Sequence, residues 1–480
     1  MHSDFLYLFL YIFIFYSIGF ISLLSFFPSV LRKRSFFVIC GIAWALGNCF
    51  GVLVLYVLAF AQKLSIITPL NIFVLCVVFL VLLLLILYKK KVHTQIVQSK
   101  NLKATLVIGV FFLIFFFPLL KNALFSYLID WDSIAIWLLK ARVFFYAGGV
   151  WSTPFFNDQS IFQYAHKAYP VGFSLLISGY YMLIGKINDQ AVQLYISMFY
   201  LNLVFIVYGF FRERMYKLYS ITIFLIVISL LIFPYIIIYS HNGYADIPLS
   251  FIMTVCLILC AYVCDMERKQ IVYHALIFII SGLGATIKNE GIAFFMIINS
   301  ISLLLLFLHQ THHTYKLNVR RIFIATGLSI LVFLPLGLWH YFKLLNHIET
   351  DSYLHNAQLY SDMFPRIKFI INLYLNEMIN TSKYGVMLIP FLFLFILEYT
   401  FLIAAKKIRI LIPSFVLIAQ LGAYTLIYTI TNVPLDWQVL TSFDRLMLHL
   451  IPGFYIVLIY QYVPMIDVIK NSMQKKKDCI

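Results

Sequence analysis

Residues 247–264 read IPLSFIMTVCLILCAYVC, a run dominated by apolar side chains and free of charged ones. Coiled as an α-helix, a run of this length spans about 27 Å, close to the roughly 30 Å of hydrocarbon in a bilayer. Every backbone amide in lipid must be bonded within its own segment, so a helix is the only form in which such a run crosses. The run therefore predicts a transmembrane helix.

Similar runs recur along the whole chain of 480 residues, of which 63% are hydrophobic and 11% charged. That composition excludes a water-soluble globule and predicts an all-α, polytopic integral membrane protein. The candidate spans lie near 5–27, 36–60, 67–88, 104–120, 169–185, 190–211, 218–238, 247–264, 271–287, 291–308, 322–340, 384–404, 408–430 and 446–464.

The formal net charge of +16 comes from short basic clusters between the apolar runs, as in loops on the cytoplasmic side of a membrane. We therefore expect a lipid bilayer as the partner of these charges and no nucleic acid. The clusters are Arg32 to Arg34, Lys89 to Lys91, Arg212 to Lys217, Arg268-Lys269, Lys316 to Arg321, Lys406 to Arg409, and Lys475 to Lys477.

All seven clusters lie on one face only if one of the runs 169–185 and 190–211 does not cross. The run 169–185 is short, begins beside Pro170 and contains Gly172 and Gly179, so we expect it to be re-entrant or juxtamembrane. About 13 crossings then follow from the positive-inside rule. The same assignment sends the acidic loop around residue 130 to the extracytoplasmic face.

The chain is predicted to form a single membrane-embedded domain, 1–480, because no Gly-, Ser- or Pro-rich linker divides it. Residues 1–103 form extra N-terminal spans. Two outer segments, 121–168 and 341–382, are long enough for structure of their own. In the first of them, residues 133–146 place apolar side chains at helical spacing and predict an interfacial amphipathic helix.

The first outer segment begins with Asp130-Trp131-Asp132, two carboxylates one residue apart beside a membrane face. A carboxylate near lipid is costly to ionise unless water, a cation or a positive partner meets it. We interpret the pair as functional, and a solvated loop is the alternative.

An ordered set of motifs then resembles the bacterial GT-C membrane glycosyltransferases, in particular the protein mannosyltransferase and aminoarabinose transferase group. The resemblance covers roughly residues 104–460, and its specificity lies in the order of the pieces. The pieces are Asp130-Trp131-Asp132, Trp137, Lys140-Ala141, His166, Tyr169-Pro170, Gly243 to Pro248, Lys288-Asn289-Glu290-Gly291, and Asp436-Trp437 with Ser442 and Arg445.

The resemblance implies a multi-pass enzyme of the cell (inner) membrane with its active site on the extracytoplasmic side. Such an enzyme takes a sugar from a polyprenyl-phosphate carrier and passes it to a lipid, glycan or protein acceptor. The chain departs from that family in its three additional N-terminal spans, whose role the resemblance does not supply.

The chemistry of such a transfer needs a base for the acceptor and positive groups for the departing phosphate. Asp132 is the predicted general base of an inverting reaction. Asp130 either shares that role or holds the acceptor or a divalent cation, Mg²⁺ or Mn²⁺. The predicted phosphate partners are Lys140, Arg142, Lys288 and Arg445, with the arginines offering a fork and the lysines a point charge.

Five further residues are predicted to contact substrates, namely His166, Tyr169, His241, Asp246 and Glu290. For three of them a structural role stays open. His241 could simply be hydrogen-bonded at the interface, Asp246 could cap a helix, and Glu290 could form a structural ion pair with Lys288.

Two functions from other classes remain alternatives. A transporter or lipid-linked sugar flippase would also have many spans, but paired broken helices in two related halves are not evident in the sequence. A surface-polysaccharide ligase or polymerase would use the same membrane and a similar donor, and would rely on outer arginine and histidine groups instead of an Asp-x-Asp pair.

Overall fold

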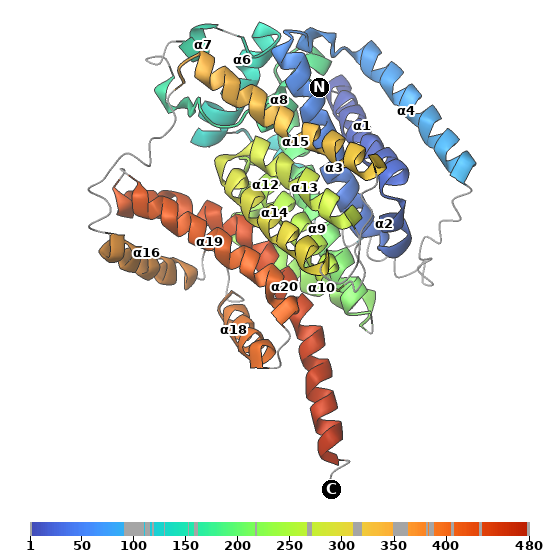
Figure 1. The fold of residues 1–480 in the computed structure, drawn as a ribbon. Coiled ribbons are helices and arrows are strands. Elements are labelled where there is room, and N and C mark those ends of the chain that lie inside the picture. The colour runs from blue at the N-terminus through green and yellow to red at the C-terminus, as the bar shows by residue number, and fades with distance from the viewer. Residues whose placement is uncertain are drawn as a thin grey trace.

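The computed structural model of the chain describes residues 2–90, 110, 116–117, 120–128, 130–151, 153–157, 162–216, 218–265, 271–310, 319–348, 363–380, 383, 388–404, 408–431 and 434–477. Within these ranges helices are the only regular secondary structure, which confirms the all-α prediction there (Figure 1). The helices are α1 His2–Phe26, α2 Pro28–Lys33, α3 Phe36–Phe60, η1 Leu64–Ile66, α4 Pro69–Lys90, η2 Ser133–Leu138, α6 Leu139–Ala147, α7 Thr153–Asn157, η3 Gln163–Ala165, α8 Gly172–Ile184, α9 Asp189–Arg214, α10 Ser220–Leu231, α11 Pro234–Tyr239, α12 Asp246–Asp265, α13 Ile271–Ile287, α14 Asn289–Gln310, α15 Val319–Leu345, α16 Met363–Met378, α18 Leu388–Ala404, η5 Ile408–Leu411, α19 Ile412–Ile430 and α20 Leu435–Lys477.

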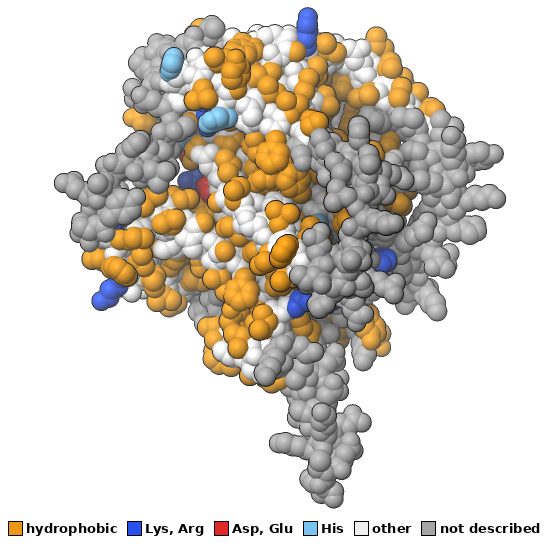
Figure 2. All heavy atoms as spheres, viewed as in Figure 1, with side chains coloured by type: hydrophobic (Ala, Val, Ile, Leu, Met, Phe, Trp, Pro, Cys, Tyr) orange, Lys and Arg blue, Asp and Glu red, His pale blue; other side chains and the backbone are white. Residues whose placement is uncertain are grey.

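Seven of the described helices are long and apolar enough to cross a membrane. Together with the largely hydrophobic face in Figure 2, they indicate a membrane protein. Shorter apolar helices cover most of the other predicted spans, while most of the run 104–120 lies outside the described residues. The figure of about 13 crossings and the division of the chain into segments stay predictions. The seven helices long enough to cross a membrane are α1, α3, α9, α12, α14, the η5–α19 segment and the first 32 residues of α20.

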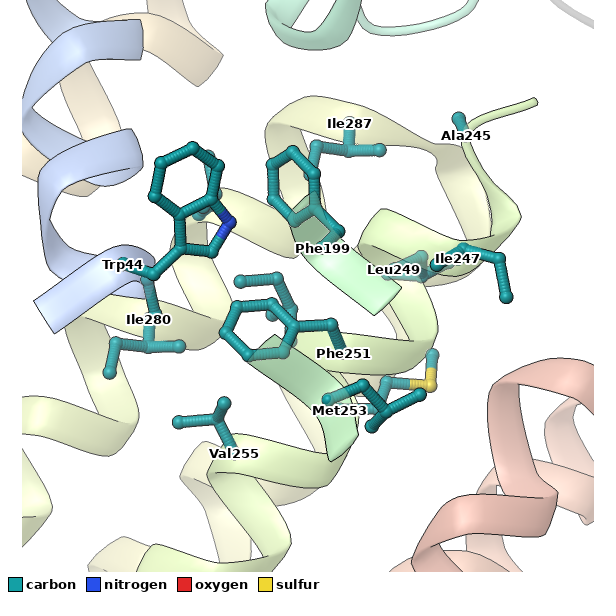
Figure 3. Close-up of a cluster of buried hydrophobic side chains, with 14 of the residues drawn as sticks. Trp44, Phe199, Ala245, Ile247, Leu249, Phe251, Met253, Val255, Ile280 and Ile287 are labelled. Carbon is teal, nitrogen blue, oxygen red and sulfur yellow. The ribbon is translucent and has the colours of Figure 1, made fainter. Parts of the chain in front are cut away.

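Helix α12 forms the centre of the bundle. It packs against α9, α13 and α20, and every residue from Asp246 to Cys264 is buried. Figure 3 shows its apolar side chains meeting Trp44 of α3, Phe199 of α9 and Ile280 of α13. Because α1 and α3 both contribute buried side chains, two of the three extra N-terminal spans belong to the same hydrophobic core, while α4 contacts α1 and keeps most of its described side chains exposed.

Small residues allow the N-terminal helices to pack closely. A Cβ on Gly47 of α3 would lie 1.8 Å from the carbonyl oxygen of Phe15 in α1, so only glycine fits there. Gly19 of α1 meets the carbonyl of Ala43 in the same way. Close backbone approach through glycine is a common means of helix association in membranes, where burial of apolar surface gives little driving force.

Charged side chains gather at both ends of α12. At its C-terminal end, Asp265 pairs with Arg214, while Arg34 lies 3.3 Å from a carboxylate oxygen of Glu213. At its N-terminal end, Asp246 begins the helix. A helix of 20 residues is about 30 Å long, so two separate ionic clusters lie a membrane thickness apart. Which membrane face each cluster lies on stays a prediction.

The predicted span 218–238 is wrong as a single helix. The structure divides it into α10 and α11, with a break at Ile232 and Phe233. Pro234 is the cause, because it lacks a backbone N–H and disfavours helical geometry in the residue before it. As a result α11 ends at Tyr239, beside α12 and α20.

The run 169–185 becomes α8, which has only 13 residues. Such a helix is about 20 Å long and too short for roughly 30 Å of hydrocarbon. It is buried along most of its length and contacts α6 and α3. Whether this run crosses the membrane stays a prediction.

The predicted amphipathic helix at 133–146 is present as a π-helical turn, η2, that continues into α6. It ends at Gly148, whose φ of 69° is the left-handed conformation that glycine adopts freely. One face of the helix is exposed, as at Tyr146, and the other packs against protein. Trp137, Lys140 and Phe144 are fully or almost fully buried, because α8 and the 163–169 turn cover this side.

Candidate functional site

An ion pair joins two segments that lie 313 residues apart in the sequence. Arg445 in α20 donates a hydrogen bond from Nη1 to Oδ2 of Asp132, the residue just before η2. Both side chains remain partly accessible, with exposed fractions of 21% for Arg445 and 24% for Asp132. The structure thus places the predicted base directly against one of the predicted phosphate partners.

Three more of the predicted site residues meet at the N-terminal end of α12. The amine of Lys288 lies 2.8 Å from Oδ1 of Asp246 and 3.1 Å from Oε1 of Glu290. Asp246 and Lys288 are buried, while Glu290 is slightly more exposed. Burial alone would lower the pKa of Lys288, but the two carboxylates outweigh it and raise the pKa above its usual value, so the lysine stays protonated.

A tight turn between α13 and α14 positions Lys288. A Cβ on Gly291 would lie 2.0 Å from the carbonyl oxygen of Gly284, so the start of α14 can approach the end of α13 only because residue 291 is glycine. The lysine follows Ile287 at the end of α13 and precedes the first turn of α14. Its side chain is therefore directed toward the N-terminal end of α12.

His449 completes this buried cluster, and the sequence analysis missed it. Its Nε2 lies 2.9 Å from Oδ1 of Asp246, and its Nδ1 lies 3.0 Å from the hydroxyl of Tyr424. The available signal was its spacing, because His449 follows Arg445 by four residues and therefore lies on the same face of α20. Asp246 does more than cap a helix, because its Oδ1 binds both Lys288 and His449.

The two ion pairs form one continuous site. The guanidinium of Arg445 interacts electrostatically with Asp246 as well as with Asp132. The charges therefore alternate in the order Asp132, Arg445, Asp246, Lys288, Glu290. We refer to these five residues, together with His449 and Tyr424, as the ionic cluster.

Asp130 lies at the edge of the ionic cluster. Burial and the neighbouring Asp132 raise its pKa, while Asn242 and His241 oppose the rise. Burial lowers the pKa of His241, although the carbonyl of Ile237, 3.0 Å from Nδ1, and the charge of Asp130 favour its protonated form. His241 is thus close to the acid pair, and its ring is hydrogen-bonded to the backbone as the structural alternative expected.

A glycine turn brings this edge together. Gly243 has a φ of 87°, and a Cβ there would lie 1.9 Å from the hydroxyl oxygen of Ser133. The backbone amide of Tyr244 donates to the side chain of Asn242 at 3.2 Å, which closes the turn. Only glycine allows the segment before α12 to approach the segment after Asp132 this closely.

The other predicted residues form separate contacts. Lys140 is fully buried and donates from Nζ to the carbonyl oxygen of His166 at 2.7 Å. Burial lowers the pKa of Lys140 to about 7. The rings of His166 and Tyr169 stack with centroids 4.9 Å apart. Arg142 pairs with Asp189 at the start of α9. These four residues are therefore engaged in holding the first outer segment, and the structure does not bring Lys140 or Arg142 to Asp132.

Several buried polar atoms around the ionic cluster have no hydrogen-bond partner within the described part of the chain. They include Oδ2 of Asp246, Oε2 of Glu290 and Oγ of Ser133. Buried polar atoms in proteins are nearly always satisfied. Unsatisfied atoms of this kind also occur elsewhere in the described part of the chain, for example Nε1 of Trp44 and the hydroxyl of Tyr56, so they do not by themselves mark a ligand site.

The acid pair does not form the donor set of a metal site. Asp132 is bound to the guanidinium of Arg445. Across the described ranges, no group of three or more His, Cys, Asp or Glu side chains is arranged to hold a metal ion. The described residues therefore do not fit the expected Mg²⁺ or Mn²⁺.

A second charged group lies one residue from Arg445. The amine of Lys383 is 2.9 Å from Asp444 and 2.5 Å from Glu377 of α16. Tyr374 of α16 also stacks on Phe443 of α20, with ring centroids 4.4 Å apart. Helix α16 is thus attached to the part of α20 that carries Arg445.

Comparison with protein-family models, with curated proteins and with solved structures gave no match to this chain.

Proposed function

We propose that this chain is a membrane glycosyltransferase of the GT-C type. It transfers a sugar from a polyprenyl-phosphate carrier to a lipid, glycan or protein acceptor on the extracytoplasmic side of the cell membrane. The observation that carries the proposal is the contact of Asp132 with Arg445, beside buried Lys288, at one end of a membrane helix bundle. A base and two cations at one membrane face are the groups that this transfer needs.

In the proposed reaction, the acceptor oxygen or nitrogen attacks the anomeric carbon of the sugar. The bond between that carbon and the phosphate oxygen breaks, and its electron pair leaves with the polyprenyl phosphate. Asp132 takes the proton of the acceptor, and Arg445 neutralises the charge that grows on the leaving phosphate. A single displacement inverts the configuration at the anomeric carbon.

Lys288 has a different role in this proposal. Two carboxylates already surround it, and it is almost completely buried. It supplies a fixed positive charge that holds Asp246 and Glu290 in place and contributes to the field at Arg445.

One observation favours the alternative of a surface-polysaccharide ligase or polymerase. Arg445 and His449 lie on one face of α20 and both contact the carboxylates of the site. Arginine and histidine groups at the outer face are what that alternative requires. The two functions differ in the donor, which is a sugar monophosphate lipid for the transferase and a glycan diphosphate lipid for the ligase or polymerase.

The test is reconstitution of the full chain in vesicles with a radiolabelled polyprenyl-phosphate sugar, and separately with a polyprenyl-diphosphate oligosaccharide. We expect release of polyprenyl phosphate from the first donor and a large loss of turnover in Asp132→Asn. The matched control is Asp265→Asn, which removes the carboxylate of the Arg214 pair at the other end of α12. Unchanged turnover in Asp132→Asn overturns the mechanism, and turnover of the diphosphate donor alone favours the ligase or polymerase.

A further inference from the structure

Both cations of the ionic cluster are already occupied by carboxylates. Arg445 binds Asp132, while Lys288 binds Asp246 and Glu290. Asp130 adds a further carboxyl group at the edge. The cluster therefore presents an excess of acidic groups, and a phosphate group that enters it must displace one of the carboxylates or meet their repulsion.

The two cations differ in how easily they can exchange a partner. Lys288 is 6% exposed and is held by two carboxylates, one of which, Asp246, is itself fixed by His449. Releasing Asp246 would leave a fully buried carboxylate without its lysine, which is costly, and the side chain of Glu290 is only 17% exposed. Arg445 and Asp132 are 21% and 24% exposed, and Asp132 lies at the end of an outer loop. The partly exposed pair is the one that can open.

On this basis, which rests on the proposed function, we infer that Asp132 is an internal anion held by Arg445 until the phosphate group of the lipid donor displaces it. One anion replaces another on the guanidinium, so Arg445 never becomes an unpaired charge. A guanidinium can hold two phosphate oxygens at once through parallel hydrogen bonds. The displaced Asp132 then turns to the acceptor.

The exchange couples the base to the donor. While Asp132 is bound to Arg445, its Oδ2 is engaged by the guanidinium and cannot take the proton of the acceptor. After displacement it lies beside the carboxyl group of Asp130, and its Oδ2 can accept the hydrogen bond of the acceptor. The donor therefore binds before the acceptor, and the base is withheld from water and acceptors when the donor is absent.

The proposal is tested by the affinity of the purified full chain for farnesyl phosphate, with the neutral alcohol farnesol as the control ligand. In the wild type, farnesyl phosphate must displace Asp132 from Arg445, and this weakens its net binding. The isosteric variant Asp132→Asn has no competing charge, so we expect it to bind farnesyl phosphate about 3- to 10-fold more tightly. Farnesol should bind both proteins equally, and Asp265→Asn should bind farnesyl phosphate as the wild type does.

A third variant separates the exchange from the phosphate site itself. Arg445→Gln should lose the preference for farnesyl phosphate over farnesol. If that preference is lost in Arg445→Gln but Asp132→Asn binds no more tightly than the wild type, the exchange is overturned and the proposed function stands. If the wild type binds farnesyl phosphate no better than farnesol, both the exchange and a phosphate site at Arg445 are overturned.

A second measurement follows the carboxylate directly. A water-soluble carbodiimide with glycine methyl ester converts accessible carboxyl groups to amides, which peptide mass spectrometry locates. We expect modification of Asp132 to rise several-fold when farnesyl phosphate is added, with no change at Asp265, whose Arg214 partner stays in place. Protection of Asp132 by farnesyl phosphate would contradict the exchange, because it would mean that the carboxylate stays bound.

Discussion

Arg445 and His449 are one helical turn apart on α20, and each binds a carboxylate from a different part of the chain, Asp132 and Asp246 respectively. A single face of one helix thereby joins the first outer segment to the centre of the bundle. The partly exposed contact, at Arg445, is suited to exchange, while the fully buried contact, at His449, is suited to hold the site in shape.

Loss of the imidazole at residue 449 should weaken the site without removing any charged group. In His449→Ala, Asp246 loses a hydrogen bond of 2.9 Å and Tyr424 loses one of 3.0 Å. Buried groups left unsatisfied cost about 1–3 kcal/mol each, so we expect a clearly lower thermal unfolding temperature in detergent and reduced turnover. Tyr424→Phe is the comparison variant, and its unfolding temperature and turnover should fall much less. Equal stability of His449→Ala and wild type would contradict this role.

Removal of the amine at residue 288 should be among the most damaging single changes. Lys288→Met leaves two carboxylates without their cation, one of them fully buried, and breaking a buried pair in this way costs about 3–5 kcal/mol. Glu290→Gln should be milder, because Lys288 keeps Asp246. The double variant Lys288→Met with Glu290→Gln should recover part of the stability that Lys288→Met loses. Yields of folded protein and thermal unfolding measure all three.

The buried amine of Lys140 should make stability depend on pH. Burial lowers its pKa to about 7, well below the value of about 10.4 in an unfolded chain. The unfolded chain therefore binds this proton more tightly, and stability rises as the pH goes from about 7 to about 10. Between about pH 6 and about pH 9 the gain is on the order of 2 kcal/mol. Thermal unfolding of Lys140→Met should show a smaller rise over that range, and an equal rise would show that Lys140 is not the titrating group.

Gly243 should tolerate no side chain, for two reasons that can be separated. Gly243→Ala places a Cβ both in a left-handed conformation and 1.9 Å from Ser133. Gly148→Ala has a similar φ of 69° but no atom within 4 Å, so it should cost only about 1 kcal/mol. We expect Gly243→Ala to lose activity and stability and Gly148→Ala to lose little of either. Similar effects of both variants would mean that the close approach to Ser133 does not matter.

The helical class and most of the helix positions were predictable from the sequence, because a membrane leaves little choice of backbone structure. The run 36–60 coincides with α3, and 271–287 coincides with α13. The error at 218–238 arose at Pro234, where hydrophobicity continues although the helix cannot. Hydrophobicity reports the environment of a segment, while Pro234 determines its backbone.

The site was predictable only in part. The pairing of Asp132 with Arg445 and of Lys288 with Asp246 and Glu290 brings together residues that the motifs had already selected. Lys140 and Arg142 were predicted as phosphate partners because they are basic residues near the predicted outer face. Both lie in α6 and have other partners, the carbonyl oxygen of His166 and the carboxylate of Asp189, and residue type alone does not report such contacts.

Helix α12 is anchored at both of its ends, through Asp246 to Lys288 and through Asp265 to Arg214, and its sides are wholly covered. Sliding or tilting it would break both anchors at once. The helix is therefore a rigid element that keeps the two ends of the bundle at a constant separation. Transporters that expose a central site alternately to each side need such an element to rock, so large-scale motion in this protein is expected to belong to its outer segments.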